Sequence, residues 1–259
     1  MRPDLLIIIP TIISKHAWLY RTLWGLAQQT GIGRFKALVL VDRKPWDNDP
    51  SPAIEIDNME VEVRDTLPPF KFKRQHAMIN EAIAEMDPLQ KICVMDDDYW
   101  CLKTNAFEIM LSEWNHEMIV VPEGYASSMG VINPHAQPRC EKNNIIYPEL
   151  GEMMERSYNS GLFGMHPCCG NPKIMLAQTW RNVGGFPSGY QHYWFADTEL
   201  YLRAKHRIVT SPIHFVHAEH TRNFPEMFSR HNAQLFMERM GKDLDERDPF
   251  RRMAEKILA

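Results

Sequence analysis

Short apolar runs alternate with amphipathic segments through the first half of the chain, and two of these runs end in aspartate. Four segments are predicted as strands: residues 5–9, 37–41, 59–63 and 92–95. Between them, residues 14–30 and 72–86 have apolar side chains at helical spacing. Strands that alternate with helices form mainly parallel sheets covered on both faces. The pattern therefore predicts an α/β fold with a mainly parallel central sheet flanked by helices.

The second half of the chain is less regular. Residues 122–160 are rich in Pro, Asn, Gly and Ser and are predicted to form a long loop. Asn171 and Pro172 are typical of a helix N-cap and first helical position, and Gly184 is typical of a helix end, so a helix is expected between them. Further helices are predicted at residues 196–206, 225–240 and 248–258, and a strand at residues 208–216.

Length and charge limit the classes of protein that this chain can be. With 259 residues and no clear linker, internal repeat or low-complexity tract, we expect one domain over residues 1–259. The formal net charge of −4, from 29 basic and 33 acidic residues, excludes a broad basic surface for unassisted nucleic-acid binding, although a local basic groove remains open. No stretch reaches the ~18 apolar residues of a membrane span. A soluble, cytoplasmic protein is therefore expected.

The cysteines do not predict a disulfide framework or a zinc site. There are 5 of them, an odd and scattered set. Cys168 and Cys169 follow His166 but lack the paired two-residue spacing of a structural zinc site. Core packing is therefore favoured over metal binding at this pair.

Asp96, Asp97 and Asp98 directly follow the predicted strand at residues 92–95. Three adjacent carboxylates repel one another unless a cation holds them, and Mg²⁺ and Mn²⁺ prefer oxygen ligands that they share with substrate phosphates. The carboxyl ends of parallel strands meet at one edge of a sheet, so Asp42 is expected nearby. The sequence predicts a metal site here, with a solvated acidic turn as the alternative.

Histidines cluster late in the chain. His214, His217 and His220 lie in the run IHFVHAEH, where alternation places His214 on the opposite face from its apolar neighbours and His217 at the end of the strand. One imidazole together with a carboxylate suits Mn²⁺ better than Mg²⁺. A zinc site with three histidines and a set of surface histidines are the competing interpretations.

Asp197 opens the predicted helix at residues 196–206, after an aromatic loop. The helix dipole favours an ionised carboxylate in the first turn, which is the state that a general base needs. An ordinary aspartate at a helix start is the alternative. Lys71, Lys73 and Arg74 precede another predicted helix and could contact phosphates, although such runs are more often solvated.

Together these features resemble the family 2 glycosyltransferases with the GT-A fold, of a stand-alone, soluble bacterial or bacteriophage type. The likeness covers about residues 4–220. It is carried by LLIIIPTI at the start, LWGLAQQT, the strand ending at Asp42, Asn80 placed 16 residues before Asp96, VMDDDYW, WRNVGGF at residues 180–186 and DTELYLR at residues 197–203. The order and spacing of these motifs are more specific than any one of them.

The resemblance implies a nucleotide-sugar-binding half (residues 1–121), an acceptor and catalytic half (residues 122–223) and C-terminal helices (residues 224–259). It also implies roles for individual residues. On the donor side, Pro10 and Thr11 would border the nucleotide and Asp42 would contact the uracil or ribose. Asn80 lies at the spacing typical of the family, and Asp96 would contact the ribose or the metal. Either Asp97 or Asp98 would be the aspartate that binds the metal. Asp98 would coordinate Mn²⁺ or Mg²⁺ at the diphosphate, with His217 as the late metal ligand and His220 as its substitute.

The reaction implied is a single displacement that inverts the anomeric centre, with Asp197 as the base that deprotonates the acceptor hydroxyl. Gly185, Tyr193 and Trp194 lie on the expected acceptor side. The acceptor classes are a glycan or lipid-linked sugar and a hydroxymethylated DNA base, and the transferred group is a hexosyl or a pentosyl unit from a UDP-sugar by preference. Alternatives are a nucleotidyltransferase on a related fold, an inactive nucleotide-sugar-binding module and a metal-dependent nuclease. The terminal helices either pack on the core or form a homodimer contact.

Overall fold

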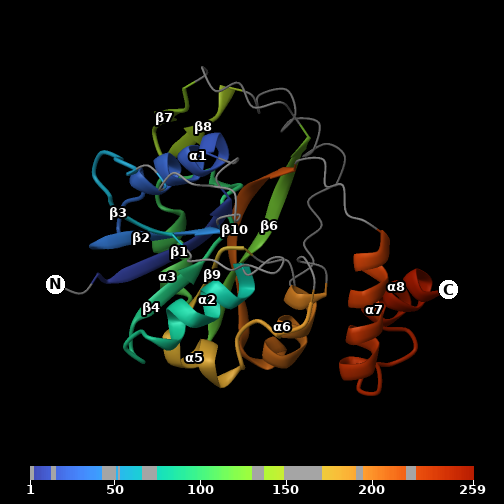
Figure 1. The fold of residues 1–259 in the computed structure, drawn as a ribbon. Coiled ribbons are helices and arrows are strands. Elements are labelled where there is room, and N and C mark those ends of the chain that lie inside the picture. The colour runs from blue at the N-terminus through green and yellow to red at the C-terminus, as the bar shows by residue number, and fades with distance from the viewer. Residues whose placement is uncertain are drawn as a thin grey trace.

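The computed structural model describes residues 3–12, 16–42, 51, 53–65, 75–129, 137–148, 171–190, 195–219 and 226–259. Within these residues, eight strands form one sheet in the order β3-β2-β1-β4-β9-β6-β10-β5, and β7 and β8 pair separately (Figure 1). The large sheet consists of β1 (Leu5–Ile12), β2 (Phe35–Asp42), β3 (Glu60–Asp65), β4 (Lys91–Val94), β5 (Tyr99–Cys101), β6 (Ile119–Met129), β9 (Lys173–Leu176) and β10 (Ile208–Glu219). The small pair consists of β7 (Arg139–Glu141) and β8 (Asn144–Ile146).

Parallel pairing dominates the large sheet. Strands β3, β2, β1 and β4 run parallel to one another, and so do β6 and β10. Strand β9 is antiparallel to both of its neighbours, and β5 is antiparallel to β10. The predicted α/β fold with a mainly parallel central sheet is confirmed. Because β1, β2 and β4 share a direction, Asp42 and the aspartates after β4 come to the same edge of the sheet.

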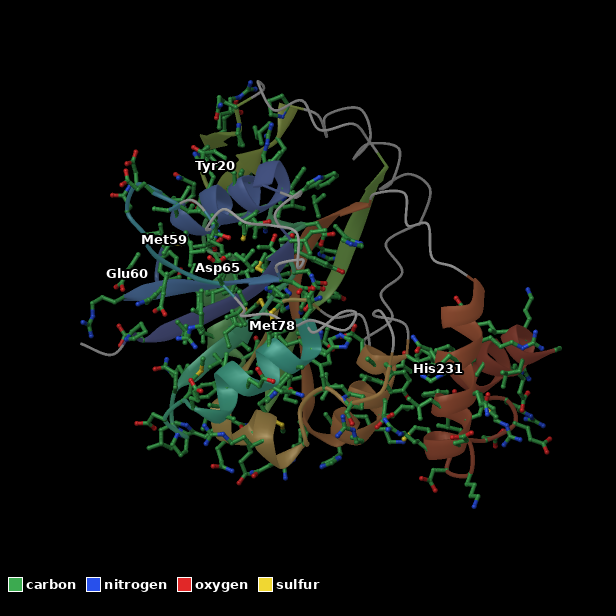
Figure 2. All side chains as sticks on the ribbon, in the orientation of Figure 1. Tyr20, Met59, Glu60, Asp65, Met78 and His231 are labelled. Carbon is green, nitrogen blue, oxygen red and sulfur yellow. The ribbon has the colours of Figure 1, made fainter. Side chains whose placement is uncertain are left out.

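Helices cover both faces of the sheet. They are α1 (His16–Ala27), α2 (Gln75–Ala84), α3 (Ala106–Ser112), α5 (Ala177–Asn182) and α6 (Ala196–Ala204). Helices α7 (Glu226–Met240) and α8 (Pro249–Leu258) lie to one side of the sheet (Figure 1). One buried cluster joins α1 and α3 to the sheet, and another joins α2, α5 and α6 to the opposite face (Figure 1). Alternation divides β1 between them, with Ile7 and Ile9 in the first cluster and Ile8 in the second. Met78 extends from α2 toward the sheet (Figure 2) and is buried there.

The predicted helix at residues 171–184 is wrong over its first half. Lys173–Leu176 form strand β9, and helix α5 begins only at Ala177. The reason is tertiary pairing, since β9 fills the gap between β4 and β6 and all four of its residues are buried. A short apolar run that is buried on both sides takes the extended form despite an N-cap pattern before it. The predicted end at Gly184 is confirmed by its left-handed φ of +82°.

The predicted loop at residues 122–160 is also wrong in part. Strand β6 continues to Met129, and residues 139–146 contain the β7–β8 pair. Parallel pairing to β10 extends β6, with register from Ile119 opposite Ile208 to Met129 opposite Glu219. Pro and Gly in the run therefore do not end the strand, because the neighbouring strand supplies its hydrogen bonds.

The C-terminal helices pack against each other and against the segment that leads into α6. Their shared buried cluster includes Phe236 on α7 and Phe250 on α8, together with Tyr190 and Phe195. Helix α8 begins after Asp248, whose carboxylate accepts the first backbone N–H groups. This cluster is separate from the two buried clusters that flank the sheet. In the described part of the chain, no helix has the length and apolar character needed to cross a membrane.

Candidate active site

The three aspartates after β4 have different surroundings. Asp97 is buried against β1 and α1, where its Oδ2 accepts a hydrogen bond from Thr11 Oγ1 at 2.6 Å. Its backbone oxygen accepts another from Thr22 Oγ1 at 2.8 Å. The two threonines thus fix the acidic turn from behind, and Asp97 belongs to the wall of the site.

Asp98 lies beside His217, which is 119 positions later in the sequence. The Oδ2 atom of Asp98 and the Nε2 atom of His217 are 3.7 Å apart, and both side chains are buried. The sheet register explains the encounter, because β10 pairs with β5 so that His217 is opposite Tyr99. The His217 and Tyr99 rings stack with centroids 4.6 Å apart. The stacking holds the imidazole next to the carboxylate.

This pair fits a divalent metal by its chemistry. A carboxylate oxygen and an imidazole nitrogen on neighbouring segments are donors that suit Mn²⁺, and a nucleotide diphosphate can complete the ligand set. Among the described residues, no group of three or more His, Cys, Asp and Glu side chains is placed to hold a metal by itself. His214 lies instead against Gly124 on β6, where a Cβ atom on that glycine would come 2.8 Å from the imidazole. His220 lies outside the described residues.

Asp197 is in the first turn of α6 and is joined to the acidic turn by a chain of hydrogen bonds. Lys173 Nζ donates to Asp197 Oδ1 at 3.2 Å and to Asn171 Oδ1 at 3.1 Å. Asn171 Nδ2 in turn donates to Asp96 Oδ2 at 2.7 Å. Helix α6, strand β9 and the end of β4 are thereby connected through side chains alone. The sequence places these residues up to 101 positions apart, and the fold brings them into one chain of contacts.

Burial and the neighbouring charges shift the pKa of two groups in this cluster, Asp96 and His76. Burial, together with the carboxylates of Asp98 and Asp197, raises the pKa of Asp96 to about 7, and Lys173 acts in the opposite direction. Burial also lowers the pKa of His76 to about 4, with Asp197 and Lys173 acting on it in opposite directions. The pKa of Asp96 therefore depends on charged groups on both sides of the site. His76 is neutral near pH 7.

The glycine turn after α5 is held from both sides. Asn80 Nδ2 donates to the Phe186 oxygen at 2.8 Å, and Asn80 Oδ1 accepts from Phe186 N and from Trp180 Nε1 at 3.0 Å each. Arg203 of α6 donates to the Gly185 oxygen at 2.6 Å. Asn80, expected on the donor side, thus holds this turn in place. Gly185, expected on the acceptor side, lies buried within it.

The remaining predicted residues fall into two groups. Pro10 and Thr11 lie near the end of β1, and Asp42 ends β2, so all three are at the same sheet edge as the aspartates. Tyr193 and Trp194 lie outside the described residues. The predicted phosphate contacts Lys71, Lys73 and Arg74, and also Cys168 and Cys169, lie outside them as well.

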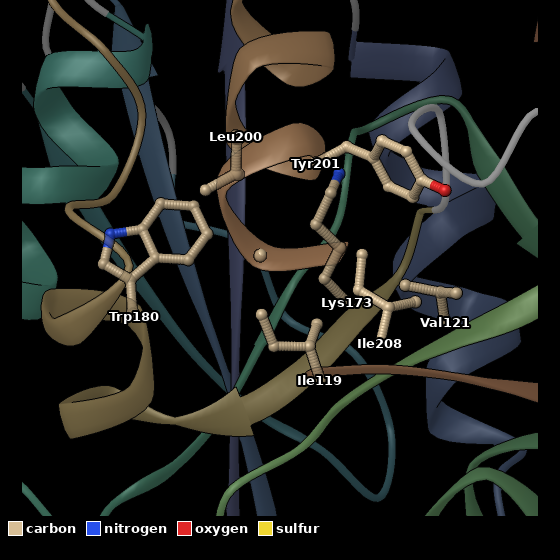
Figure 3. Close-up of a pocket in the computed structure, with 8 residues that line it drawn as sticks. Ile119, Val121, Lys173, Trp180, Leu200, Tyr201 and Ile208 are labelled. Atoms are coloured by element: carbon tan, nitrogen blue, oxygen red, sulfur yellow. The ribbon is translucent and has the colours of Figure 1, made fainter. Parts of the chain in front are cut away.

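Sequence reasoning missed Asn171, Lys173 and His76 as site residues. Asn171 was expected to cap a helix, and that assignment would have left Lys173 in an exposed first turn. The available signal was the single charge that opens the apolar run KIML, because a lysine in a buried strand requires an anionic partner. Figure 3 shows the Lys173 side chain extending from β9 toward α6, in a small cavity with room for about one water molecule. Apolar side chains line the rest of this cavity: Ile119, Val121, Trp180, Leu200, Ala204 and Ile208, with Tyr201 at one side.

No protein-family model matches the chain. No curated protein matches it by sequence. Solved structures do match by fold. TarS from S. aureus has 14% sequence identity and a TM-score of 0.51, over 100% of this chain and 42% of TarS. The present chain therefore spans less than half of the full TarS chain.

Two further structures are similar over nearly the whole chain. The mannosyltransferase PcManGT from Pyrobaculum calidifontis, in complex with GDP-Man and Mn²⁺, is 13% identical with a TM-score of 0.53, over 100% of this chain and 70% of that one. GalNAc-T7 with UDP, GalNAc and Mn²⁺ is 10% identical with a TM-score of 0.55, over 98% of this chain and 55% of that one. The chain therefore has the GT-A fold found in glycosyltransferases.

Proposed function

We propose that this chain is a metal-dependent, inverting glycosyltransferase. It moves a hexosyl or pentosyl group from a nucleotide-diphosphate sugar, with a UDP-sugar favoured, to an acceptor hydroxyl. The observation that carries the proposal is that two kinds of group meet at one edge of the sheet. Asp98 and His217 form a carboxylate–imidazole pair suited to a divalent cation, and Asp197 is a carboxylate in a helix first turn. Asp96 precedes Asp98 by two residues and is linked to Asp197 by hydrogen bonds through Asn171 and Lys173.

The chemistry divides between these groups. A divalent metal, when bound, neutralises the charge that develops on the leaving diphosphate. Asp98 and His217 would hold it. Asp197 accepts the proton of the acceptor hydroxyl while the acceptor oxygen bonds to the anomeric carbon. The bond from that carbon to the diphosphate breaks in the same step, and the nucleoside diphosphate leaves with the electron pair. A single displacement of this kind inverts the anomeric centre.

The donor side is built from the first half of the chain. Pro10, Thr11 and Asp42 at the ends of β1 and β2 would border the nucleotide, with Asp96 at the ribose or the metal. The hydrogen bond from Thr11 to Asp97 supports a fixed wall at this position. The similar structures contain either GDP-Man or UDP, so the fold accommodates more than one base, and the preference for a UDP-sugar is part of the proposal.

Two acceptor classes are compatible with the proposed chemistry. A glycan or a lipid-linked sugar offers the hydroxyl directly, and Gly185, Tyr193 and Trp194 would lie on that side. A hydroxymethylated base in DNA offers one only after it leaves the base stack. The net charge of −4 gives no broad basic surface for DNA, which favours the sugar acceptors.

A donor screen tests the function. The protein is mixed with Mn²⁺ or Mg²⁺ and with UDP-, GDP- and dTDP-sugars, and its thermal unfolding and slow nucleotide release are measured. A donor that binds only the folded chain raises the melting temperature. We expect a UDP-sugar to do so with metal in the wild type and in Asp243→Asn, a control at an exposed site, but not in Asp98→Asn. Acceptor trials with glycans and hydroxymethylated DNA follow. No stabilisation by any donor would refute the proposal.

A further inference from the structure

Lys173 occupies a position where a lysine is costly. It begins β9, between β4 and β6 in the middle of the sheet, and only 6% of its surface is exposed. Its partner in the register is Val94, and the next residues, Ile174 and Met175, belong to the two buried clusters. Removing an ammonium from water is unfavourable unless an anion is placed beside it. The position therefore calls for a specific partner.

The partners of Lys173 are groups of the proposed active site. Its ammonium donates to Asp197 Oδ1, and through Asn171 it is linked to Asp96. Within the described residues, Asp197 Oδ1 receives this one hydrogen bond and Asp197 Oδ2 receives none. The Asp197 side chain keeps 25% of its surface exposed. One carboxylate oxygen is thus fixed by the lysine, and the other remains for a substrate hydroxyl.

We propose that Lys173 is a positioning residue for the transfer reaction, which holds the Asp197 carboxylate in one orientation beside a fixed positive charge and ties it through Asn171 to the donor side of the site. This inference rests on the proposed function. The titratable groups that interact electrostatically with Lys173 or Asp197 are Asp96 after β4, His76 on α2 and the buried thiol of Cys93 on β4. Asp197 contacts the ammonium directly and Asp96 is linked to it through Asn171, so the lysine lies between two carboxylates.

A purely structural role makes a different prediction. If Lys173 serves only to balance charge during folding, its loss lowers the melting temperature but leaves the turnover of the folded enzyme unchanged. If it positions Asp197, turnover falls while donor binding persists, because the donor contacts lie at other residues. Misplacement of a catalytic group by about 1 Å can cost about 10²-fold in rate. Measuring kcat and donor Kd separately therefore distinguishes a structural role of Lys173 from a positioning role.

The test compares Lys173→Met, Lys173→Arg and a matched control, Lys91→Met, in the full chain. Lys91 is a half-buried lysine on β4 whose ammonium lies 4.8 Å from the Trp114 ring and contacts no site residue in the described part of the chain. We expect Lys173→Met to lower kcat about 10²-fold with donor Kd within about threefold of wild type. Lys173→Arg is expected to recover part of the rate because it restores the charge, and Lys91→Met to behave as wild type.

Further measurements keep the test decisive. Lys173→Gln is the second variant if Lys173→Met does not fold, with the same expected loss of turnover. Melting temperatures of Lys173→Met, Asp197→Asn and the double variant are also compared, and the two changes should be less harmful together than their sum predicts. Unchanged turnover in Lys173→Met beside an inactive Asp197→Asn would overturn this inference alone. A wild-type chain that neither binds a donor nor transfers a sugar would overturn the proposed function and this inference with it.

Discussion

At the scale of single residues, His76 shows how the site controls a titratable group. Its ring packs against that of Phe186, with centroids 4.1 Å apart and the ring planes tilted by 30°. Burial lowers its pKa from 6.5 to about 4, Asp197 opposes that change and Lys173 reinforces it. Asp197 thus has a neutral imidazole and a charged ammonium as neighbours. The imidazole gives the site a polar surface without a second positive charge near pH 7.

The lowered pKa of His76 predicts a pH-dependent stability. The unfolded chain binds a proton at His76 below about pH 6.5, whereas the folded chain does so only below about pH 4. Stability from this group is therefore fully present above pH 6.5 and is lost as the pH falls toward 4, by at most about 3 kcal/mol. Denaturant unfolding at pH 7 and pH 4.5 should show a larger loss in wild type than in His76→Gln. Equal losses in the two proteins would contradict this assignment.

Asp197 carries a prediction of its own. As a general base it should contribute about 10²- to 10⁴-fold to the rate, so Asp197→Asn should lose that much kcat. Donor affinity should stay close to that of wild type, because the proposed donor contacts come from other residues. Glu199→Gln, two residues along the same helix, tests whether the loss reflects only a missing carboxylate on α6. Full activity of Asp197→Asn would remove this residue from the mechanism.

At the scale of secondary-structure elements, the glycine turn shows why the motif GGF has its composition. Gly184 and Gly185 both have positive φ, at +82° and +58°. A Cβ atom on Gly185 would come 2.4 Å from Asn80 Oδ1 and 2.7 Å from Trp180 Nε1. The turn therefore requires glycine both for its backbone conformation and for its close packing. The same packing fixes the position from which the chain continues toward α6.

Gly185→Ala should be more destabilising than Gly189→Ala. Both positions have positive φ, which costs about 1–2 kcal/mol for alanine. At Gly189 the nearest atom to a new Cβ is the flexible Leu235 Cδ2 at 3.2 Å, whereas at Gly185 it is the hydrogen-bonded Asn80 amide. The difference between the two variants in denaturant unfolding isolates the clash. Similar values would show that the turn adapts and that Asn80 does not hold it.

The elements show how far sequence alone can go. The strand that precedes Asp96 and the helix that begins near Asp197 were predicted because their signals are local: an apolar run and a first-turn carboxylate. Strand β9 was not, because its extended form depends on β4 and β6, which are distant in sequence. Lys173 was missed with it, since a wrong element assignment hides which side chains are buried. The proximity of Asp98 to His217 was predicted through the family resemblance, and the register of β5 and β10 provides its physical reason.

At the scale of the whole molecule, helix α7 is tied to the segment before α6. Arg239 Nη1 donates to the Ser188 oxygen at 2.8 Å and lies 3.6 Å from Glu199 Oε2. The Tyr190 hydroxyl donates to the same Glu199 oxygen at 2.6 Å, and burial together with this partner raises the pKa of Tyr190. His231 of α7 lies on the side of the helix near α6 (Figure 2). The C-terminal helices thus brace the helix that carries Asp197.

Because α7 braces the helix that carries Asp197, we expect Arg239→Met to change the KM for the acceptor. The change removes the contacts to Ser188 and Glu199 while the buried face of α7 stays intact. We expect the KM for the acceptor to rise several-fold, on the order of the cost of one lost charge-assisted hydrogen bond, with donor Kd unchanged. Arg252→Met, at an exposed position on α8, is the control. A change in donor Kd without a change in acceptor KM would contradict this role of α7.

Electron paramagnetic resonance of bound Mn²⁺ tests the central claim most directly, because it reports the ligands of the metal. The protein is titrated with Mn²⁺ in the presence of UDP, and nitrogen coupling to the bound ion is measured in wild type, His217→Gln and His214→Gln. We predict one tightly bound Mn²⁺ with imidazole coupling in wild type and in His214→Gln, loss of the coupling in His217→Gln, and loss of tight binding in Asp98→Asn. Mn²⁺ that binds equally well to Asp98→Asn, or that shows the same coupling without His217, would contradict the metal site on which the proposed function depends.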